Sequence, residues 1–337
     1  MGAGAFGKGS SVLVKGNIIA NTVASSYAPC TGVMVLESGK VTITGNVTST
    51  TSDGGRGIHV QDEGSSASIG SNVVVNAPAS SDAIGIWASY KTIVDVKGSV
   101  SINTAGNVGV SCYDSKVTIG EFLKVPAAAA YVTFAGVDKM STEHEAVSSK
   151  SGYREYKRDS SYVWIMETNL SKVDVTIADM VWTGKKRTPT VFILNGKSYP
   201  ISGNATVSSS GANKNIGTGT ITLTGIGNFE GTRTIKFKIA PKTTKVAKIV
   251  AGKKQMKISW KKTAKAQKIS KYQVRYRVKG TSKWTTKTVD ASKSSLLIKS
   301  LKAGKSYQVQ IRSYKTVSKV KYYSDWSATK TSAKIKK

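Results

Sequence analysis

Several features of helical, membrane and exported proteins are missing from this sequence. It has no long stretch with the 3.6-residue apolar period of a helix and no apolar run of membrane-spanning length. Only 6 Pro stand against 32 Gly, and Ser, Thr and Val are frequent, a composition that favours an all-β protein. The opening residues MGAGAFGKGS lack the basic start and apolar core of a signal peptide. We therefore expect a cytoplasmic protein or a piece of a longer secreted one.

Acidic residues are nearly absent from the last part of the chain. Residues 1–140 contain 9 basic and 9 acidic side chains, and residues 141–240 contain 13 and 8. Residues 241–337 contain 28 basic and only 2 acidic side chains, which accounts for most of the net charge of +31. This asymmetry predicts a domain boundary near residue 240, and a length of 337 residues fits about two or three domains.

A seven-residue pattern recurs five times in the first part of the chain. Its first, third and seventh positions are apolar, and its fifth and sixth are mostly small or polar, at residues 12–18, 41–47, 67–73, 94–100 and 117–123. A second pattern, Gly-Val/Ile-x-apolar, alternates with it and starts at Gly32, Gly57, Gly85 and Gly109. Two short strands per repeat of about 23 to 29 residues indicate a solenoid. The pattern resembles the right-handed parallel β-helix over roughly residues 8–135, with about five coils.

Stacked coils predict three inward columns of side chains. They are Val12, Val41, Ala67, Val94, Val117; then Val14, Ile43, Ile69, Val96, Ile119; then Ile18, Val47, Val73, Val100, Leu123. At the corner, we expect Asn17, Asn46 and Asn72 to form a hydrogen-bonded ladder. Cys112 falls in the column of Val35, Val60 and Ala88, and is expected to be a core residue. Cys30 is expected in a loop about three coils away, roughly 14 Å, too far for a disulfide, which needs about 7 Å.

The outward column of the Gly-anchored strand holds the candidate site. It reads Met34, His59, Trp87 and Ser111, and turn residues follow it at Glu37, Asp62, Tyr90 and Asp114. An exposed Trp beside His, Tyr and carboxylates suits a sugar ring and its hydroxyls. The candidate ligand-binding residues are therefore His59, Trp87, Glu37, Asp62, Tyr90 and Asp114. The alternative is an ordinary polar turn with one surface aromatic.

Catalytic and metal-binding interpretations have weaker support. Parallel β-helices commonly carry polysaccharide lyases and hydrolases, and Glu37 and Asp62 lie on adjacent predicted coils. However, Arg56 is the single Arg of this region and no second acidic cluster accompanies it. Glu143, His144 and Glu145 are interpreted as a solvated linker rather than metal ligands. We predict no catalytic residue, no metal and no cofactor, and we leave enzymatic activity open.

Residues 169–240 resemble the Ig-like repeat of surface proteins from Gram-positive anaerobes. The matching residues are Trp182-Thr183-Gly184, Pro189, Gly217-Thr218-Gly219 and the GIGNFEGT stretch at 225–232. Gly203-Asn204-Ala205 stands where that repeat usually has Asp-Tyr. The resemblance implies a small β-sandwich.

Residues 241–337 resemble the fibronectin type III domain. Leu301, Gly304 and Tyr307 reproduce its Leu-x-x-Gly-x-x-Tyr corner, and SDWS at 324–327 precedes the last strand. The resemblance implies a second β-sandwich, in which the Tyr hydroxyl bonds to nearby backbone. No Arg-Gly-Asp tripeptide occurs, so integrin recognition is not implied.

The 28 basic residues of this last domain comprise 25 Lys and 3 Arg. One interpretation is a solvated surface that resists aggregation. The other is attraction to a polyanion, such as teichoic acid, an anionic wall glycan, mucin or a lipid surface. Specific nucleic-acid recognition is not favoured, because a Lys-rich face offers charge without base readout.

These observations predict an all-β chain with a parallel β-helix (1–140), a linker or cap (141–168), an Ig-like sandwich (169–240) and a fibronectin type III sandwich (241–337). The architecture implies an extracellular or cell-surface setting. We expect a non-enzymatic adhesion or scaffolding protein, with the β-helix displayed outward, glycans as partners of its face, and an anionic envelope polymer bound by the basic domain. The alternatives are a carbohydrate-active enzyme with a catalytic β-helix and a purely structural spacer. No Leu-Pro-x-Thr-Gly sorting signal supports covalent wall attachment.

Overall fold

The computed structural model describes residues 1–21, 30–52, 54–78, 82–103, 108–126, 130–208 and 211–337. The chain divides into two compact units, Met1–Thr168 and Asn169–Lys337. Within the described residues, nearly all regular structure is β, and the exception is a single 3-10 turn at Lys265–Gln267. The prediction of an all-β chain is confirmed.

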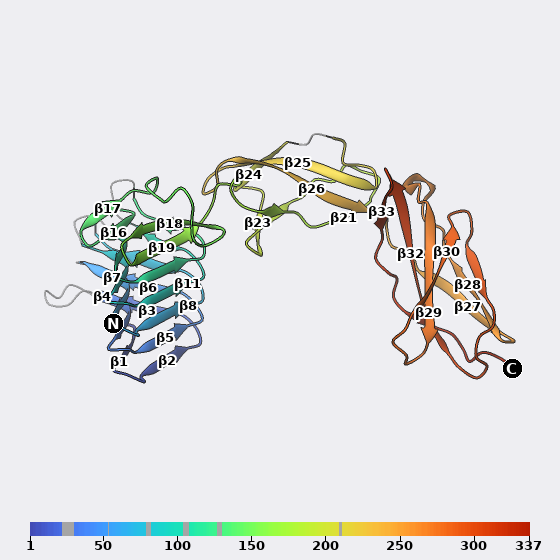
Figure 1. Cartoon of the computed structure of the whole chain (residues 1–337), viewed down its shortest axis with the longest axis horizontal. Helices are drawn as coiled ribbons and strands as arrows, with labels where there is room; N and C mark the ends of the chain where they lie inside the picture. The colour runs from blue at the N-terminus through green and yellow to red at the C-terminus, as the bar shows by residue number, and fades with distance from the viewer. Residues whose placement is uncertain (22–29, 53, 79–81, 104–107, 127–129, 209–210) are drawn as a thin grey trace. The chain divides into compact units, whose positions relative to one another are not determined.

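The first unit is a parallel β-solenoid in which coils of three strands stack on one another (Figure 1). The first sheet contains β1 (Ala3–Phe6), β4 (Cys30–Leu36), β7 (Gly55–Gln61), β10 (Ile84–Ser89), β13 (Val108–Tyr113) and β16 (Val132–Phe134). The second contains β2 (Ser11–Val14), β5 (Lys40–Ile43), β8 (Ser66–Ile69), β11 (Ile93–Val96) and β14 (Lys116–Ile119). The third contains β3 (Ile18–Asn21), β6 (Val47–Thr50), β9 (Val73–Asn76), β12 (Val100–Ile102) and β15 (Leu123–Lys124).

The expectation of two strands per repeat was wrong, because each coil has three. The seven-residue pattern does not lie on one strand. Its first and third residues lie on the second sheet, and a three-residue corner then turns the chain, so that its seventh residue opens a strand of the third sheet. The corner residues are small or polar, which lets the chain bend sharply without burying a large side chain.

All three predicted inward columns are confirmed by the strand register. Val14 pairs with Ile43, Ile43 with Ile69, Ile69 with Val96 and Val96 with Ile119, and the other two columns align in the same way. Ile43, Ile69 and Ile119 are fully buried. Burying each of these side chains stabilises the fold by about 1.5–3 kcal/mol before entropy is counted.

The predicted asparagine ladder is also present. Asn17 Oδ1 accepts a hydrogen bond from the backbone N–H of Asn46 at 2.8 Å, and Asn46 Oδ1 accepts one from the N–H of Asn72 at 3.1 Å. Asn72 Oδ1 continues the series to the N–H of Ser99 at 2.8 Å. Each side chain therefore satisfies a backbone donor of the next coil, at the corner where the sheet hydrogen bonds are interrupted.

A β-hairpin covers the last coil. In it, β18 (Tyr153–Arg158) pairs antiparallel with β19 (Ser161–Met166), which in turn adds to β14 in parallel. A short strand, β17 (Val137–Lys139), pairs with β16. Tyr156 and Phe134 are buried in the solenoid core, so this segment closes the end of the core with large aromatic side chains.

Residues 169–240 form two small sheets. One contains β20 (Val175–Thr176), β22 (Val191–Leu194) and β23 (Lys197–Pro200). The other contains β21 (Met180–Val181), β26 (Thr232–Ala240), β25 (Gly217–Gly225) and β24 (Ala205–Ser208). Phe192, Tyr199 and Phe229 pack against one another, with ring centroids 5.2–5.6 Å apart.

The C-terminal residues form a sandwich of two antiparallel sheets. The first contains β27 (Val246–Gly252), β28 (Gln255–Trp260) and β31 (Ser295–Ile298). The second contains β30 (Thr285–Asp290), β29 (Lys271–Val278), β32 (Tyr307–Val317) and β33 (Val320–Tyr323), with β34 (Lys330–Thr331) paired to β32. The buried Tyr307 hydroxyl accepts a hydrogen bond from the backbone N–H of Lys302 at 3.0 Å, which is the corner bond that the resemblance to a fibronectin type III domain implies.

Candidate functional site

The predicted outward column of the solenoid lies in register on the first sheet. Met34 pairs with His59, His59 with Trp87, and Trp87 with Ser111. The parallel register places these side chains on the same face of successive coils. The sequence therefore identified correctly which side chains are neighbours, although register does not say which of them a ligand can reach.

Trp87 is not a free aromatic platform, because Arg56 covers it. The Arg56 guanidinium carbon lies 3.6 Å from the centroid of the Trp87 ring. The ring centroid of His59, on the coil adjacent to that of Trp87, lies 5.5 Å from the same centroid. Arg56 also donates a hydrogen bond to His59 Nδ1 at 2.8 Å. His59 is only 8% exposed. A sugar that stacked on this face of Trp87 would have to displace the arginine.

Because a guanidinium can only donate, His59 Nδ1 must accept and the ring proton must lie on Nε2. Nε2 then faces Gln61 Oε1 at 3.4 Å, and Gln61 Nε2 faces Asp62 Oδ1 at 3.4 Å. Burial lowers the pKa of His59, and the nearby Arg56 charge lowers it further. His59 is therefore neutral at pH 7, and the Arg56 charge is linked through it to the Asp62 carboxylate.

The four predicted turn residues share one unusual backbone conformation. Glu37, Asp62, Tyr90 and Asp114 have φ values between 45° and 74°, a left-handed region that residues other than glycine seldom adopt. The turns are held together between coils, since the Glu37 N–H donates to Asp62 Oδ2 at 3.2 Å and the Tyr90 N–H donates to the Tyr113 carbonyl at 3.0 Å. One Asp62 carboxylate oxygen is thus engaged in turn structure.

Tyr113 was missed by the sequence analysis. Its ring meets that of Tyr90 edge to face, with centroids 5.4 Å apart, and the two side chains are 48% and 54% exposed. Beside them is a shallow hollow of about 260 Å³, lined by Tyr113, Asp114, Phe134, Ala135, Arg158, Asp159, Ser160 and Ser161. Tyr113 lies four residues after Gly109, one position beyond the four-residue pattern, so the pattern did not include it.

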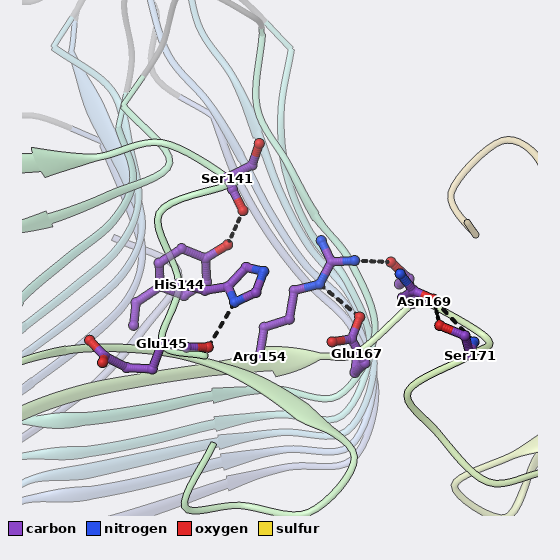
Figure 2. A network of polar contacts seen from close by, with 9 residues as sticks. Ser141, His144, Glu145, Arg154, Glu167, Asn169 and Ser171 are labelled. Carbon is purple, nitrogen blue, oxygen red and sulfur yellow. Dashed lines mark hydrogen bonds and ion pairs between the residues drawn. The ribbon is translucent and has the colours of Figure 1, made fainter. Parts of the chain in front are cut away.

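The Glu143, His144 and Glu145 trio lies in the cap, and Figure 2 shows His144 and Glu145 there. His144 Nδ1 bonds the backbone oxygen of Glu145 at 2.9 Å, and the Glu143 carboxylate accepts the Met140 N–H at 2.6 Å. Arg154 pairs with Glu167 at 2.8 Å, with both side chains largely buried. In the described part of the chain, no group of three or more His, Cys, Asp or Glu side chains is placed to hold a metal ion.

The two cysteines are separate and buried. Cys112 pairs in register with Ala88, as predicted. Burial raises the pKa of its thiol to about 12, so it is protonated at neutral pH and unsuited to nucleophilic attack. The expectation that Cys30 lies in a loop was wrong, because Cys30 opens strand β4 and its side chain is buried.

The C-terminal sandwich presents its lysines to solvent. Of the 25 Lys between residues 241 and 337, every one is exposed except the partly buried Lys315. Within this domain, which the structure describes in full, the single ion pair joins Lys271 to Asp290 at 3.6 Å. The remaining lysines have no acidic partner within 4 Å, so the positive field of the domain is not neutralised internally.

A comparison with protein-family profiles agrees with this description of the C-terminal sandwich. A family profile described as Fibronectin type III domain matches residues 240–330, and no curated protein sequence matches the chain. Similar solved chains include one described as "Myokine structure", at 12% identity and a TM-score of 0.24, covering 28% of this chain and 98% of that one. The fn3 domain of human collagen alpha-1(XX) matches at 13% identity and a TM-score of 0.24, covering 29% and 89%. The third fibronectin III domain of human KIAA0343 matches at 11% identity and a TM-score of 0.23, covering 27% of this chain and 82% of that one.

The described part of the chain contains no helix with the length and apolar character needed to cross a membrane.

Proposed function

We propose that this chain is a non-enzymatic extracellular protein that serves adhesion or scaffolding, and that its basic C-terminal domain attaches to an anionic polymer of a cell envelope. The fibronectin type III match supports an extracellular setting, since such domains are typical of extracellular proteins. The resemblance of residues 169–240 to an Ig-like surface repeat supports a Gram-positive bacterial surface as that setting.

One observation carries this proposal: the C-terminal domain has a net charge of +26 that the domain itself leaves almost unpaired. Mutual repulsion among so many like charges destabilises a compact domain. A polyanion relieves that repulsion, and its binding is further favoured by the release of condensed counterions. Such binding must weaken steeply as salt concentration rises.

The test is binding of the full chain to immobilised heparin and to purified cell walls across a NaCl gradient. We expect retention at low salt and release at moderate salt. Lys→Gln changes at four exposed sites of the C-terminal domain (Lys279, Lys283, Lys287, Lys299) should lower the release concentration. The matched control makes the same change at four exposed solenoid sites (Lys8, Lys15, Lys40, Lys116) and should have little effect. Absence of binding at low salt, or equal loss in both variants, contradicts the proposal.

The exposed Tyr90 and Tyr113 rings favour a second function, glycan binding on the solenoid. Aromatic rings stack on the apolar faces of sugars, and adjacent carboxylates accept bonds from hydroxyls. Asp114, Asp159 and Arg158 supply such polar groups around the adjoining hollow. This site overlaps the predicted one at Tyr90 and Asp114 but is centred on Tyr113 rather than on Trp87.

A further inference from the structure

The three arginines of the C-terminal domain form a ladder with three aromatic rings. In order along it stand Arg277, Trp284, Arg275, Trp326, Arg312 and Tyr323. The five successive distances from guanidinium carbon to ring centroid are 4.3, 4.6, 4.2, 4.4 and 3.9 Å. All six side chains are partly buried, unlike the exposed lysines around them. We call this set the arginine ladder.

Glutamines on the neighbouring strands fix the orientation of each guanidinium. Arg275 Nε donates to Gln310 at 2.7 Å, Arg277 Nε to Gln308 at 2.9 Å, and Arg312 Nε to Gln273 at 2.8 Å. In each case the Arg and the Gln are direct cross-strand partners in the β29–β32 register. Glutamine is neutral, so it orients the guanidinium without neutralising its charge. The two terminal nitrogens of each guanidinium, which form a fork of donors, make no hydrogen bond within this fully described domain.

The ladder places the three charges in a regular row. The β29–β32 register sets Arg277, Arg275 and Arg312 at three successive levels, each two residues from the next. At about 3.3 Å per residue, Arg277 and Arg275 rise from positions of β29 roughly 7 Å apart, and Arg312 rises from the neighbouring strand β32 one level further on. No acidic residue of this domain lies within ion-pair distance of any of them. The row is therefore partly desolvated, oriented and without a counterion.

Burial lowers the pKa of Arg275 and of Arg312, which is the direction expected when water is removed from a cation without an anion replacing it. Arginine stays protonated in proteins in spite of such shifts. A bound oxyanion would restore the lost solvation through two parallel charge-assisted hydrogen bonds per guanidinium.

We infer that the arginine ladder binds a glycan polymer that carries a series of sulfate or phosphate esters, with each guanidinium fork holding one ester group. This inference rests on the proposed attachment to an anionic polymer and identifies the contact that selects among such polymers. Guanidinium groups cover both faces of Trp284 and of Trp326. Nucleic-acid bases therefore have no indole face on which to stack, whereas the ester groups of a glycan polymer need only the guanidinium forks.

The test separates fork geometry from charge. The triple variant Arg275→Lys, Arg277→Lys, Arg312→Lys keeps the net charge of +31 but replaces each planar fork by a point charge. In the full chain we expect its affinity for heparin to fall at least about tenfold, the scale of losing charge-assisted hydrogen bonds. The comparison variant Lys279→Gln, Lys287→Gln, Lys299→Gln loses three charges and retains the ladder. Its affinity for heparin should fall only a few-fold.

A second variant guards against misfolding of the triple mutant. Gln310→Glu places a carboxylate next to Arg275 without changing side-chain size, so the domain should fold while an internal anion occupies the guanidinium. Heparin affinity should again fall markedly. Gln255→Glu, on β28 of the other sheet, introduces the same charge away from the ladder and should have little effect. Thermal melting and near-ultraviolet circular dichroism report whether each variant is folded.

The outcomes are distinct for the two proposals. Unchanged heparin binding in folded Arg→Lys and Gln310→Glu variants, together with loss in the Lys→Gln variant, overturns the ladder proposal and leaves the charge-based function standing. If the unmodified chain binds neither heparin nor polyphosphate at low salt, both proposals fail. Parallel measurements with heparin and polyphosphate distinguish sulfate from phosphate preference. Equal or tighter ladder-dependent binding of single-stranded DNA would overturn the assignment to a glycan.

Discussion

Arg56 in the solenoid and the arginines of the C-terminal domain use the same contact in opposite electrostatic settings. Each guanidinium stacks on an aromatic ring, at 3.6 Å for Arg56 on Trp87 and 3.9 Å for Arg312 on Tyr323. Arg56 is joined through His59 and Gln61 to the carboxylate of Asp62. Arg312 donates its hydrogen bond to the neutral side chain of Gln273, and no carboxylate follows. The solenoid closes its polar network internally, whereas the C-terminal domain leaves its network open to an external anion.

The same contrast extends to the two surfaces as a whole. Residues 1–140 carry equal numbers of basic and acidic side chains, and residues 241–337 carry 28 and 2. Backbone donors at the solenoid corners are satisfied by asparagines of the preceding coil. The solenoid is therefore a structure whose polar groups mainly maintain shape, and the C-terminal domain is one whose polar groups mainly generate a field.

The largest expected effect breaks the solenoid alone. Ile69→Asp places an unpaired charge in a fully buried column and should destabilise the solenoid by several kcal/mol, enough to unfold it. The outward Thr42→Asp on the neighbouring strand should be nearly silent. Urea unfolding followed by circular dichroism provides the comparison, and heparin binding by the C-terminal domain should survive both changes. Similar tolerance of the two substitutions would mean that the register is wrong.

An intermediate effect concerns which aromatic side chain on the solenoid contacts a glycan. Tyr113→Ala removes an exposed ring and should weaken binding of any recognised glycan by about 1–3 kcal/mol. Trp87→Ala should matter less, because Arg56 already covers that ring. A glycan array measures both variants against the unmodified chain. A larger loss of glycan affinity in Trp87→Ala than in Tyr113→Ala would instead place the glycan site at Trp87.

Turnover assays can test the alternative of a catalytic solenoid. Glu37→Gln and Asp62→Asn preserve hydrogen bonding but remove acid–base capacity. We expect no turnover of pectin, host glycans or mucin by the unmodified chain, in assays for reducing sugars and unsaturated products. Cleavage that disappears in Asp62→Asn would establish an enzyme and refute the non-enzymatic function.

The smallest expected effect is a pH dependence confined to the solenoid. Because the pKa of His59 is lowered in the folded state, the unfolded chain takes up the proton first as pH falls below about 6.5. The free energy of unfolding of the solenoid should therefore decline from about pH 6.5 down to the lowered pKa of His59. His59→Gln should flatten this decline, and His144→Gln, in the cap, should not. Melting curves across this pH range measure it.

The parts of the structure that follow from local repetition could be predicted from the sequence. Ile43 and Ile69 recur at a fixed place in a repeating pattern, so their pairing needed no knowledge of the rest of the fold. The stacking of Arg56 on Trp87 could not be inferred, because it depends on the side-chain conformations of residues on two adjacent coils. Trp326 was recognised only within the SDWS stretch. Its contact with Arg275 depends on the pairing of β29 with β32 and on the backbone hydrogen bonds that hold Ser324 and Ser327 against β32. The contacts that the repeating pattern does not determine were the ones missed.

One further consequence lies in the corners of the solenoid. The connection between the second and third strands of a coil has three residues each time, at 15–17, 44–46, 70–72, 97–99 and 120–122. This corner holds the asparagine ladder, and a change of length there would break the register of every later coil. For protein engineering, the unit that can be added or removed at this corner is therefore a whole coil, and each coil extends the stack by one strand spacing of about 4.8 Å.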